Sequence, residues 1–357
     1  MSVRPRAPAV LGALGLATLA SILFGLGRGA MSIPPGEVLS ALAGAAGLPG
    51  TDGAGGPMAN VVLSIRLPRV VAGALVGASL AVCGAALQGL FRNPLADPGL
   101  IGVSAGASLG AMLVIVLGPA MLAAVPALGA LPGSELHLLP FAAFAGGLAA
   151  TWIVHRFATR DGRTGTATLL LAGIAIAATA GAGTGVLTYL ADDVQLRTLT
   201  FWSLGSLAPS TWERIGYVAP VLALGALFVA LHARALDAML LGESEALHLG
   251  FEVERVKRRL LVAVAVVVGA AVSVSGIIGF VGLVVPHLVR LAAGPGHRSL
   301  LPASALLGAA LLVGADVVAR TVVAPAELPI GIVTALFGGP FFLWLLVRER
   351  GRIGTGA

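Results

Sequence analysis

Two apolar stretches of similar sequence, Leu75–Pro94 (LVGASLAVCGAALQGLFRNP) and Val267–Pro286 (VVGAAVSVSGIIGFVGLVVP), indicate how this chain folds. They share two glycines and a proline, separated by seven and ten residues: Gly77, Gly84 and Pro94 in the first stretch, Gly269, Gly276 and Pro286 in the second. Each stretch has 20 residues, most of them apolar or small. The match favours an internal repeat, although small residues in a glycine-rich sequence also coincide by chance.

At roughly 20 apolar residues per crossing, the whole sequence predicts an all-α polytopic membrane protein with about ten transmembrane helices. The expected segments are 8–27, 62–91, 99–118, 138–157, 167–190, 214–233, 260–278, 280–292, 300–320 and 328–347. As a helix, segment 62–91 is about 45 Å long and must tilt or protrude, whereas 280–292 is too short to cross and is expected to be a half-helix. The first segment is long enough to be a retained helix rather than a signal peptide.

The two copies of the repeat begin in the second and the seventh predicted spans. An offset of five helices reverses the chain direction across the membrane, so the repeat is expected to be inverted. Inverted repeats are typical of transporters, in which two halves move about a central site. We therefore expect one transmembrane domain over residues 1–357, with repeat halves at about 60–200 and 255–350.

Composition excludes several classes of protein. Hydrophobic residues make up 57% of the chain and charged residues 11%, with a mean hydropathy of +0.99, too few charges to solvate a water-soluble fold. The single cysteine, Cys83, excludes an internal disulfide and a cysteine-based metal cluster. The net charge of +6 does not indicate nucleic-acid binding, because the basic residues are scattered at the ends of apolar runs.

The basic residues instead predict the orientation of the chain in the membrane. With the N-terminus in the cytoplasm, 16 of the 22 basic residues face inward, which agrees with the positive-inside rule and makes both termini cytoplasmic. The exceptions are Arg28, Arg66, Arg69, Arg197, Arg214 and Arg320.

The chain lacks the motifs of several kinds of active site. A Walker A loop needs Gly-Lys-Ser/Thr, but the only lysine, Lys257, precedes Arg258. Two overlapping G-x-S-x-G matches, at Ser104 and Ser108, lie in an apolar helix where glycines at four-residue spacing indicate helix packing rather than a hydrolase. The six histidines have no spacing that suggests a metal site on a helix.

Proton- or sodium-driven transport uses acidic residues inside the membrane, and Asp316 is the best candidate. Arg320 lies four residues further on, so the two side chains are expected to neutralise each other on one helical face. Ion-coupled transport therefore gains no positive support.

Three polar features remain outside the apolar runs. Arg66 and Arg69 flank Pro68 at the outer start of the second span, where they either snorkel or, with Arg320, bind an acidic partner. Residues 241–250 predict a short amphipathic helix closed by Gly250, which is either a surface helix or one lodged in a partner's groove. Residues 91–99 predict a tight cytoplasmic turn.

Together these features resemble the FecCD-type permease subunits of ABC importers for iron chelates, haem and vitamin B12. The matching motifs follow the family's order over roughly residues 60 to 347: RLPR at 66–69, NPLADPG at 93–99, GE at 242–243 through LG at 249–250, GFVGLVVPH at 279–287, ADVVAR at 315–320 and ELPIG at 327–331.

The resemblance implies a type II ABC importer permease fold in the bacterial inner membrane. It also implies a homodimer with the translocation path on its two-fold axis, two cytoplasmic ATPase subunits that bind ATP and magnesium, and a periplasmic substrate-binding protein. The chain itself is then a non-catalytic subunit with no cofactor and no metal site. The fifth span, with Gly181, Gly183 and Gly185, and the tenth span are implied to line the path.

The same resemblance assigns roles to individual residues. Binding-protein docking falls to Arg66, Arg69 and Arg320. Coupling to the ATPase falls to a helix at about 240–251, through Gly242, Glu243, Ala246, Leu249 and Gly250. The cytoplasmic gate falls to Asn93, Leu95, Thr164 and Thr166.

For the substrate, residues 195–207 (QLRTLTFWSLGSL) look most like the haem-importing members. The resemblance thus favours an ATP-driven haem importer, with ferric siderophore or vitamin B12 as the alternative cargo. An ion-coupled carrier that works alone and a membrane hydrolase are the rival classes of protein.

Overall fold

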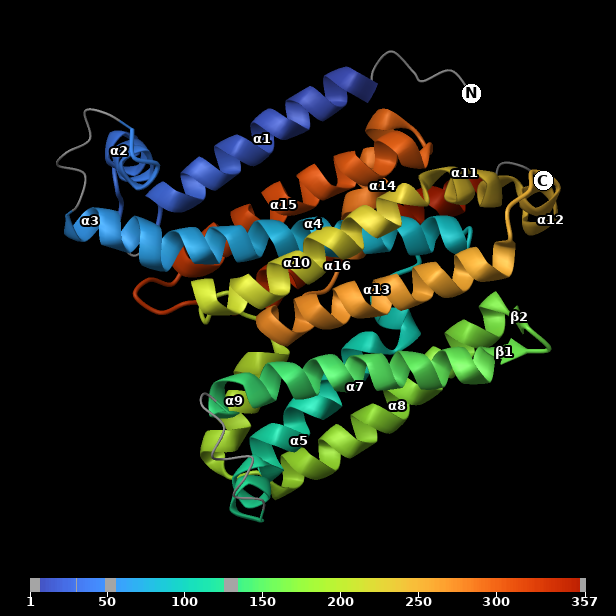
Figure 1. The fold of residues 1–357 in the computed structure, drawn as a ribbon, viewed down its shortest axis with the longest axis horizontal. Coiled ribbons are helices and arrows are strands. Elements are labelled where there is room, and N and C mark those ends of the chain that lie inside the picture. The colour runs from blue at the N-terminus through green and yellow to red at the C-terminus, as the bar shows by residue number, and fades with distance from the viewer. Residues whose placement is uncertain (1–6, 30, 49–55, 125–133, 354–357) are drawn as a thin grey trace.

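The computed structural model describes residues 7–29, 31–48, 56–124 and 134–353 as one bundle of long helices (Figure 1). The elements are α1 (Ala7–Gly27), α2 (Pro35–Ala45), α3 (Pro57–Asn60), the π-helix Val61–Arg66, α4 (Leu67–Leu90), the 3-10 helix Pro98–Ile101, α5 (Val103–Ala124), α7 (Ser134–Ala158), β1 (Thr159–Arg160), β2 (Arg163–Thr164), α8 (Thr166–Leu190), α9 (Asp193–Ser203), α10 (Trp212–Leu231), α11 (Ala233–Leu241), α12 (Glu243–His248), α13 (Val253–Ser275), α14 (Val281–Ala293), α15 (His297–Thr321) and α16 (Ile330–Ile353).

The helices confirm the predicted set of about ten spans. Within the described ranges, eight helices are long and apolar enough to cross a membrane, and α14 and the Ile330–Leu345 part of α16 are shorter apolar helices. The second span is the longest, because α3, the π-helix and α4 form 34 continuous helical residues, Pro57–Leu90. The predicted half-helix is also present, as the 13 residues of α14.

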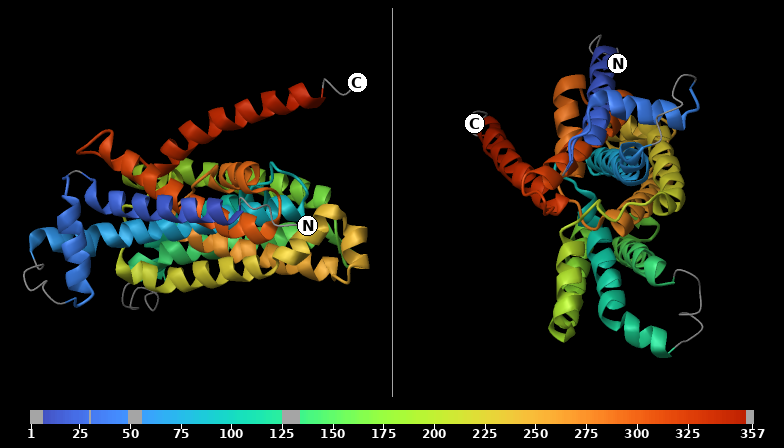
Figure 2. Two further views of the ribbon diagram at one scale, coloured as in Figure 1. Left: turned by 90° about the horizontal axis from the view of Figure 1, so that it is seen from above. Right: turned by 90° about the vertical axis from the view of Figure 1, so that its left-hand side faces the viewer.

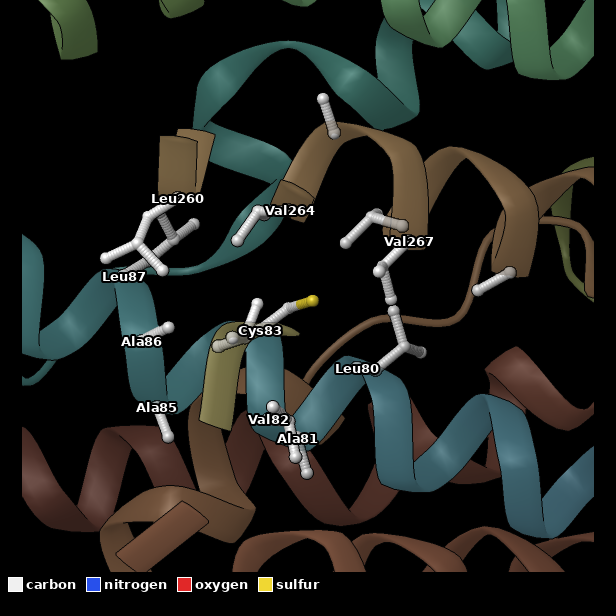
Figure 3. Packing of buried hydrophobic residues seen from close by; sticks show 14 of the residues in the cluster. Leu80, Ala81, Val82, Cys83, Ala85, Ala86, Leu87, Leu260, Val264 and Val267 are labelled. Atoms are coloured by element: carbon white, nitrogen blue, oxygen red, sulfur yellow. The ribbon is translucent and has the colours of Figure 1, made fainter. Parts of the chain in front are cut away.

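Helix α4 lies at the centre of the bundle. Eighteen of its 24 residues are buried, and it packs against α15, α14, α10 and α13. Figure 3 shows its apolar side chains, among them Cys83 and Leu87, facing Leu260 and Val264 of α13. The Cys83 side chain is fully buried and acts as a small apolar group in this packing.

Glycines let α4 approach its neighbours at backbone distance. A Cβ on Gly84 would lie 1.9 Å from the carbonyl oxygen of Gly282 in α14, and one on Gly77 would lie 2.2 Å from that of Gly308 in α15. No side chain fits at these separations, so both crossings require glycine.

The contacts between helices have the predicted inverted symmetry. Each helix of the first half has a counterpart in the second: α4 corresponds to α13, α5 to α14, α7 to α15 and α8 to α16. Corresponding pairs make corresponding contacts. Helix α4 packs on α15 as α13 packs on α7, and α5 packs on α7 as α14 packs on α15. Helix α10 contacts both α4 and α13. Figure 1 shows α4 and α13 running in opposite directions, so the two halves are inverted.

The two aligned stretches nevertheless differ in local structure. Helix α4 continues through Gly84, whereas α13 ends at Ser275 and Gly276 takes a positive φ of 66°. A Cβ on Gly276 would lie 2.2 Å from the carbonyl oxygen of Trp202. The break allows α14 to begin inside the bundle, next to Gly84.

The G-x-S-x-G stretch forms the predicted helix-packing face. Ser104 and Ser108 lie in the continuous helix α5. A Cβ on Gly106 would lie 2.3 Å from the carbonyl oxygen of Gly146 in α7, and one on Gly110 would lie 2.2 Å from that of Ala142. These glycines bring α5 and α7 together. The two serines follow the 3-10 helix Pro98–Ile101, whereas a nucleophile elbow has its serine directly after a strand.

The two ends of the bundle differ in the elements they carry. Helices α2, α3 and α9 lie at one end, called here the α2 end, and α11, α12 and the β1–β2 hairpin lie at the other, the α12 end (Figure 1). The start of α1 and the end of α16 both point toward the α12 end (Figure 2). This arrangement agrees with termini on one side of a membrane.

Candidate functional site

At the α2 end, Arg69 is the centre of an ion-pair cluster. Its guanidinium lies 2.9 Å from Asp316 Oδ1 of α15, and its Nη1 donates to both carboxylate oxygens of Glu327 at 2.9 Å. Arg320 completes the cluster with Nε 3.5 Å from Asp316 Oδ2. The predicted pairing of Asp316 with Arg320 is confirmed, and Arg69 is the closer partner of that carboxylate.

The three arginines predicted to dock a partner are mostly enclosed by this chain. Arg66 donates to the carbonyl oxygens of Leu26 and Met31, and Arg320 donates to that of Gly25. The exposed fractions are 6% for Arg66, 5% for Arg320 and 11% for the Arg69 side chain. Within this cluster, the Glu327 side chain is the most exposed, at 42%.

At the α12 end, the predicted amphipathic helix is α12, which begins directly after Gly242 and ends at His248, two residues before Gly250. Gly242 precedes it with a φ of 128°, and Gly250 follows with a φ of 87°, the left-handed conformation of a C-terminal glycine. Ala246 is fully buried and fixes α12 to the bundle. Leu241, Leu247 and Leu249 are 60–66% exposed, so α12 and its flanks present an apolar surface at this end.

Thr164, a predicted gate residue, lies in the β1–β2 hairpin that joins α7 to α8. Its side chain is 7% exposed and its hydroxyl lies 3.0 Å from that of Thr159. Its backbone N–H donates to Glu254 Oε2 at 2.9 Å. Thr166 begins α8 two residues later and is half-buried.

The other two predicted gate residues form a separate turn after α4. Asn93 Oδ1 accepts a hydrogen bond from the N–H of Leu95 at 2.9 Å, and Asp97 Oδ1 accepts one from Gly99 at 2.8 Å. This confirms the predicted tight turn. Burial raises the pKa of Asp97, and the hydrogen bond from Gly99 opposes that shift.

Sequence reasoning missed a polar cluster around the buried ammonium of Lys257, which joins α12, α13 and the β1–β2 hairpin. Lys257 Nζ donates to Glu243 Oε2 at 2.7 Å, to Glu254 Oε1 at 3.2 Å and to the carbonyl oxygen of Thr164 at 3.2 Å. The signal in the sequence was the single lysine among 22 basic residues, seven residues after Gly250.

A second pair, also not foreseen, ties α11 to α15. Asp237 Oδ1 accepts hydrogen bonds from the backbone N–H of His297 at 2.7 Å and lies 2.9 Å from its Nδ1. Burial acts to raise the pKa of Asp237, but the hydrogen bonds from His297 and the positive charges of His297 and Arg298 outweigh it, so the pKa lies below its ordinary value.

Helices α8 and α16 carry residues on one side of the molecule that no other part of the described chain covers. Seen end-on in Figure 2, α16 diverges from the bundle on the same side as α8. A Cβ on Gly181 or Gly185 would meet no atom within 4 Å, whereas Gly183 packs against Leu109. Leu336 and Phe337 of α16 are 66% and 71% exposed. No group of three or more potential metal-ligating side chains occurs among the described residues.

Comparison with known proteins identifies the family. The family model described as the FecCD transport family matches residues 17–348. The chain belongs to the FecCD transport family. Within it, the chain is 50% identical over 293 residues to the hemin transport system permease protein HmuU of Yersinia pestis, covering 82% of this chain and 85% of that one.

Two further relatives place this FecCD chain among ABC transporter permeases. It is 48% identical over 290 residues to the cobalamin import system permease protein BtuC of Halobacterium salinarum, covering 81% of this chain and 74% of that one. A solved inward-facing conformation of a metal-chelate type ABC transporter superposes with a TM-score of 0.81 at 31% identity, covering 96% of this chain and 99% of that one. The chain is therefore a multi-pass membrane permease of this transport family, with the type II fold.

Proposed function

We propose that this chain is the membrane subunit of an ATP-driven importer that moves haem from the periplasm to the cytoplasm. The observation that carries the proposal is α12, a short helix anchored by Ala246 that presents exposed leucines beyond the spans. An energy-supplying partner is needed because the sequence has no phosphate-binding loop. The ATPase is a separate chain, and this subunit has no catalytic role.

Coupling to that ATPase falls to the surface around α12, with Gly242, Glu243, Ala246, Leu249 and Gly250. Exposed Leu247 and Leu249 suit a groove on a partner, since an amphipathic helix binds by laying its apolar face into one. The α12 end then faces the cytoplasm, together with both termini, in agreement with the positive-inside bias.

A homodimer accounts for the open side between α8 and α16. Gly181, Gly185 and Phe337 are exposed there, and a second copy facing them encloses a path lined by small and apolar side chains. Such a path suits a large ligand that must pass without tight binding. Asn93, Leu95, Thr164 and Thr166 then form the gate at its cytoplasmic end.

Docking of an acidic substrate-binding protein falls to Arg66, Arg69 and Arg320 at the periplasmic α2 end. Arginine forks match carboxylates, and Arg69 already holds one exposed carboxylate, that of Glu327. An incoming glutamate therefore has to share or replace Glu327, while Arg66 and Arg320 hold the cluster in place.

Haem is favoured as the cargo by the 50% identity to a hemin permease and by the chemistry of α9. This helix exposes Arg197 and Phe201, with the guanidinium 5.9 Å from the ring centroid. An arginine suits a propionate and an aromatic ring suits a porphyrin face. Ferric siderophores and vitamin B12 are the alternatives, the latter supported by the 48% identity to a cobalamin permease.

Uptake into proteoliposomes tests this function. Liposomes containing the permease and its ATPase are expected to take up haem only when the binding protein and internal ATP are both present. Uptake of a ferric siderophore or vitamin B12 in place of haem would overturn the substrate alone. Uptake in an ion gradient without the ATPase would overturn the importer and favour a secondary transporter.

A further inference from the structure

Lys257 is a buried cation that connects three separate elements. Its side chain is 5% exposed, and its ammonium contacts Glu243 at the start of α12, Glu254 on its own helix α13, and Thr164 in β2. Figure 1 shows the hairpin and α12 on either side of the beginning of α13.

The number of hydrogen-bond acceptors around the Lys257 ammonium matches its number of donors. A lysine ammonium has three N–H donors and no acceptor, and Lys257 has three oxygen acceptors within 3.2 Å. Burying a cation is costly unless opposite charge and hydrogen bonds offset it. Loss of Lys257 would leave the carboxylates of Glu243 and Glu254 without their shared counter-ion. An arginine at this position would not reproduce these contacts, because its planar guanidinium directs its N–H donors differently from the compact ammonium of lysine.

Thr164 is held on both sides of its peptide backbone by this cluster. Glu254 accepts from its N–H at 2.9 Å, and Lys257 donates to its carbonyl oxygen at 3.2 Å. The rest of the hairpin is loosely attached, because Arg160 and Asp161 are exposed at 95% and 93%. The backbone leads directly from Thr164 into α8, which begins at Thr166.

We propose that Lys257 is a positioning residue that transmits a displacement of α12 to the β1–β2 hairpin and the start of α8. A partner that pushes or pulls α12 moves Glu243, and Glu243 moves the ammonium that holds Thr164. The inference rests on the proposed coupling role of α12 and adds the link from that helix to the gate.

The permease alone tests the link without any transport. In Lys257→Met, amide hydrogen exchange at Thr164 is expected to accelerate by about ten-fold or more, the factor for a coupling free energy of about 1.4 kcal/mol. Arg255→Gln is the matched control, because Arg255 pairs with Glu252 on the exposed face of the same helix and is expected to leave Thr164 unchanged. Unchanged exchange in Lys257→Met would overturn the proposal.

The assembled transporter tests the transmission. With haem-loaded binding protein, Lys257→Met is expected to hydrolyse ATP but to import at least about ten-fold less haem per ATP, and Arg255→Gln is expected to match the unaltered complex. A merely structural lysine would lower both activities in proportion, leaving haem imported per ATP unchanged, and that result would contradict the proposal.

A second variant covers the case in which Lys257→Met does not fold. Glu254→Gln keeps the Lys257–Glu243 pair and weakens the hold on Thr164, so it is expected to raise Thr164 exchange and lower haem per ATP in the same direction. Normal values of both would overturn the proposal. If the unaltered complex imports nothing, the proposed function fails instead, while the exchange experiment still decides whether Lys257 holds the hairpin.

Discussion

Substituting Gly308 by alanine tests the crossing of α4 and α15 on which the inverted arrangement depends. A Cβ on Gly308 would lie 2.3 Å from the carbonyl oxygen of Gly77 and 2.7 Å from the Cβ of Ala81. An ordinary contact lies at 3.4–4 Å, so the two helices must separate by about 1 Å, which costs about 1–3 kcal/mol by overpacking. Gly12→Ala is the control, because nothing lies within 4 Å of its Cβ on α1.

Comparing the two variants isolates the packing effect. Both replace a helical glycine by alanine, so the gain in helix propensity, up to about 1 kcal/mol, is common to them. The free energy of unfolding, measured by denaturant titration in detergent micelles, is expected to be lower in Gly308→Ala than in Gly12→Ala by about 1–3 kcal/mol. Equal values for the two variants would refute the close approach of α4 and α15.

Three further predictions concern the ends of the bundle. Leu249→Ser is expected to weaken ATPase binding by about ten-fold or more while the permease unfolds as before, measured by surface plasmon resonance and thermal melting. Glu327→Gln frees Arg69 and is expected to tighten binding of an acidic substrate-binding protein by up to about five-fold, and weaker binding would show that Glu327 itself is the contact. Since folding lowers the pKa of Asp237 through His297, that carboxylate stabilises the protein at neutral pH and the contribution disappears as pH falls through the lowered pKa. Asp237→Asn is therefore expected to lower the melting temperature at neutral pH and to flatten its fall below about pH 5, and an unchanged profile would contradict the assignment.

The spans could be predicted from the sequence because the bilayer fixes their length. Apolar runs of sufficient length became helices, and the long second span and the short α14 were both anticipated from residue counts alone. The glycines of the first copy of the repeat are explained by the crossings at Gly77 and Gly84, where the neighbouring backbone lies too close for a Cβ. The break of α13 at Gly276 was not predicted, because glycine in an apolar run fits a continuous helix as well as its end.

The environment of the site residues could not be predicted, because their partners are distant in sequence. Arg69 binds Glu327, 258 residues away, and Arg320 donates to Gly25, 295 residues away. The pattern of charges therefore indicated three outward arginines but not that they are buried. The α12 helix was predicted because its limits are local, set by Gly242 and Gly250. The docking and gating roles stay predictions.

Uptake of haem by the reconstituted complex is the decisive test of an ATP-driven importer. The permease, its ATPase and its binding protein are placed in one liposome preparation, and haem uptake is measured with each component omitted in turn. Uptake is expected only when ATP, the ATPase and the binding protein are all present. Uptake that continues without the ATPase would contradict this expectation.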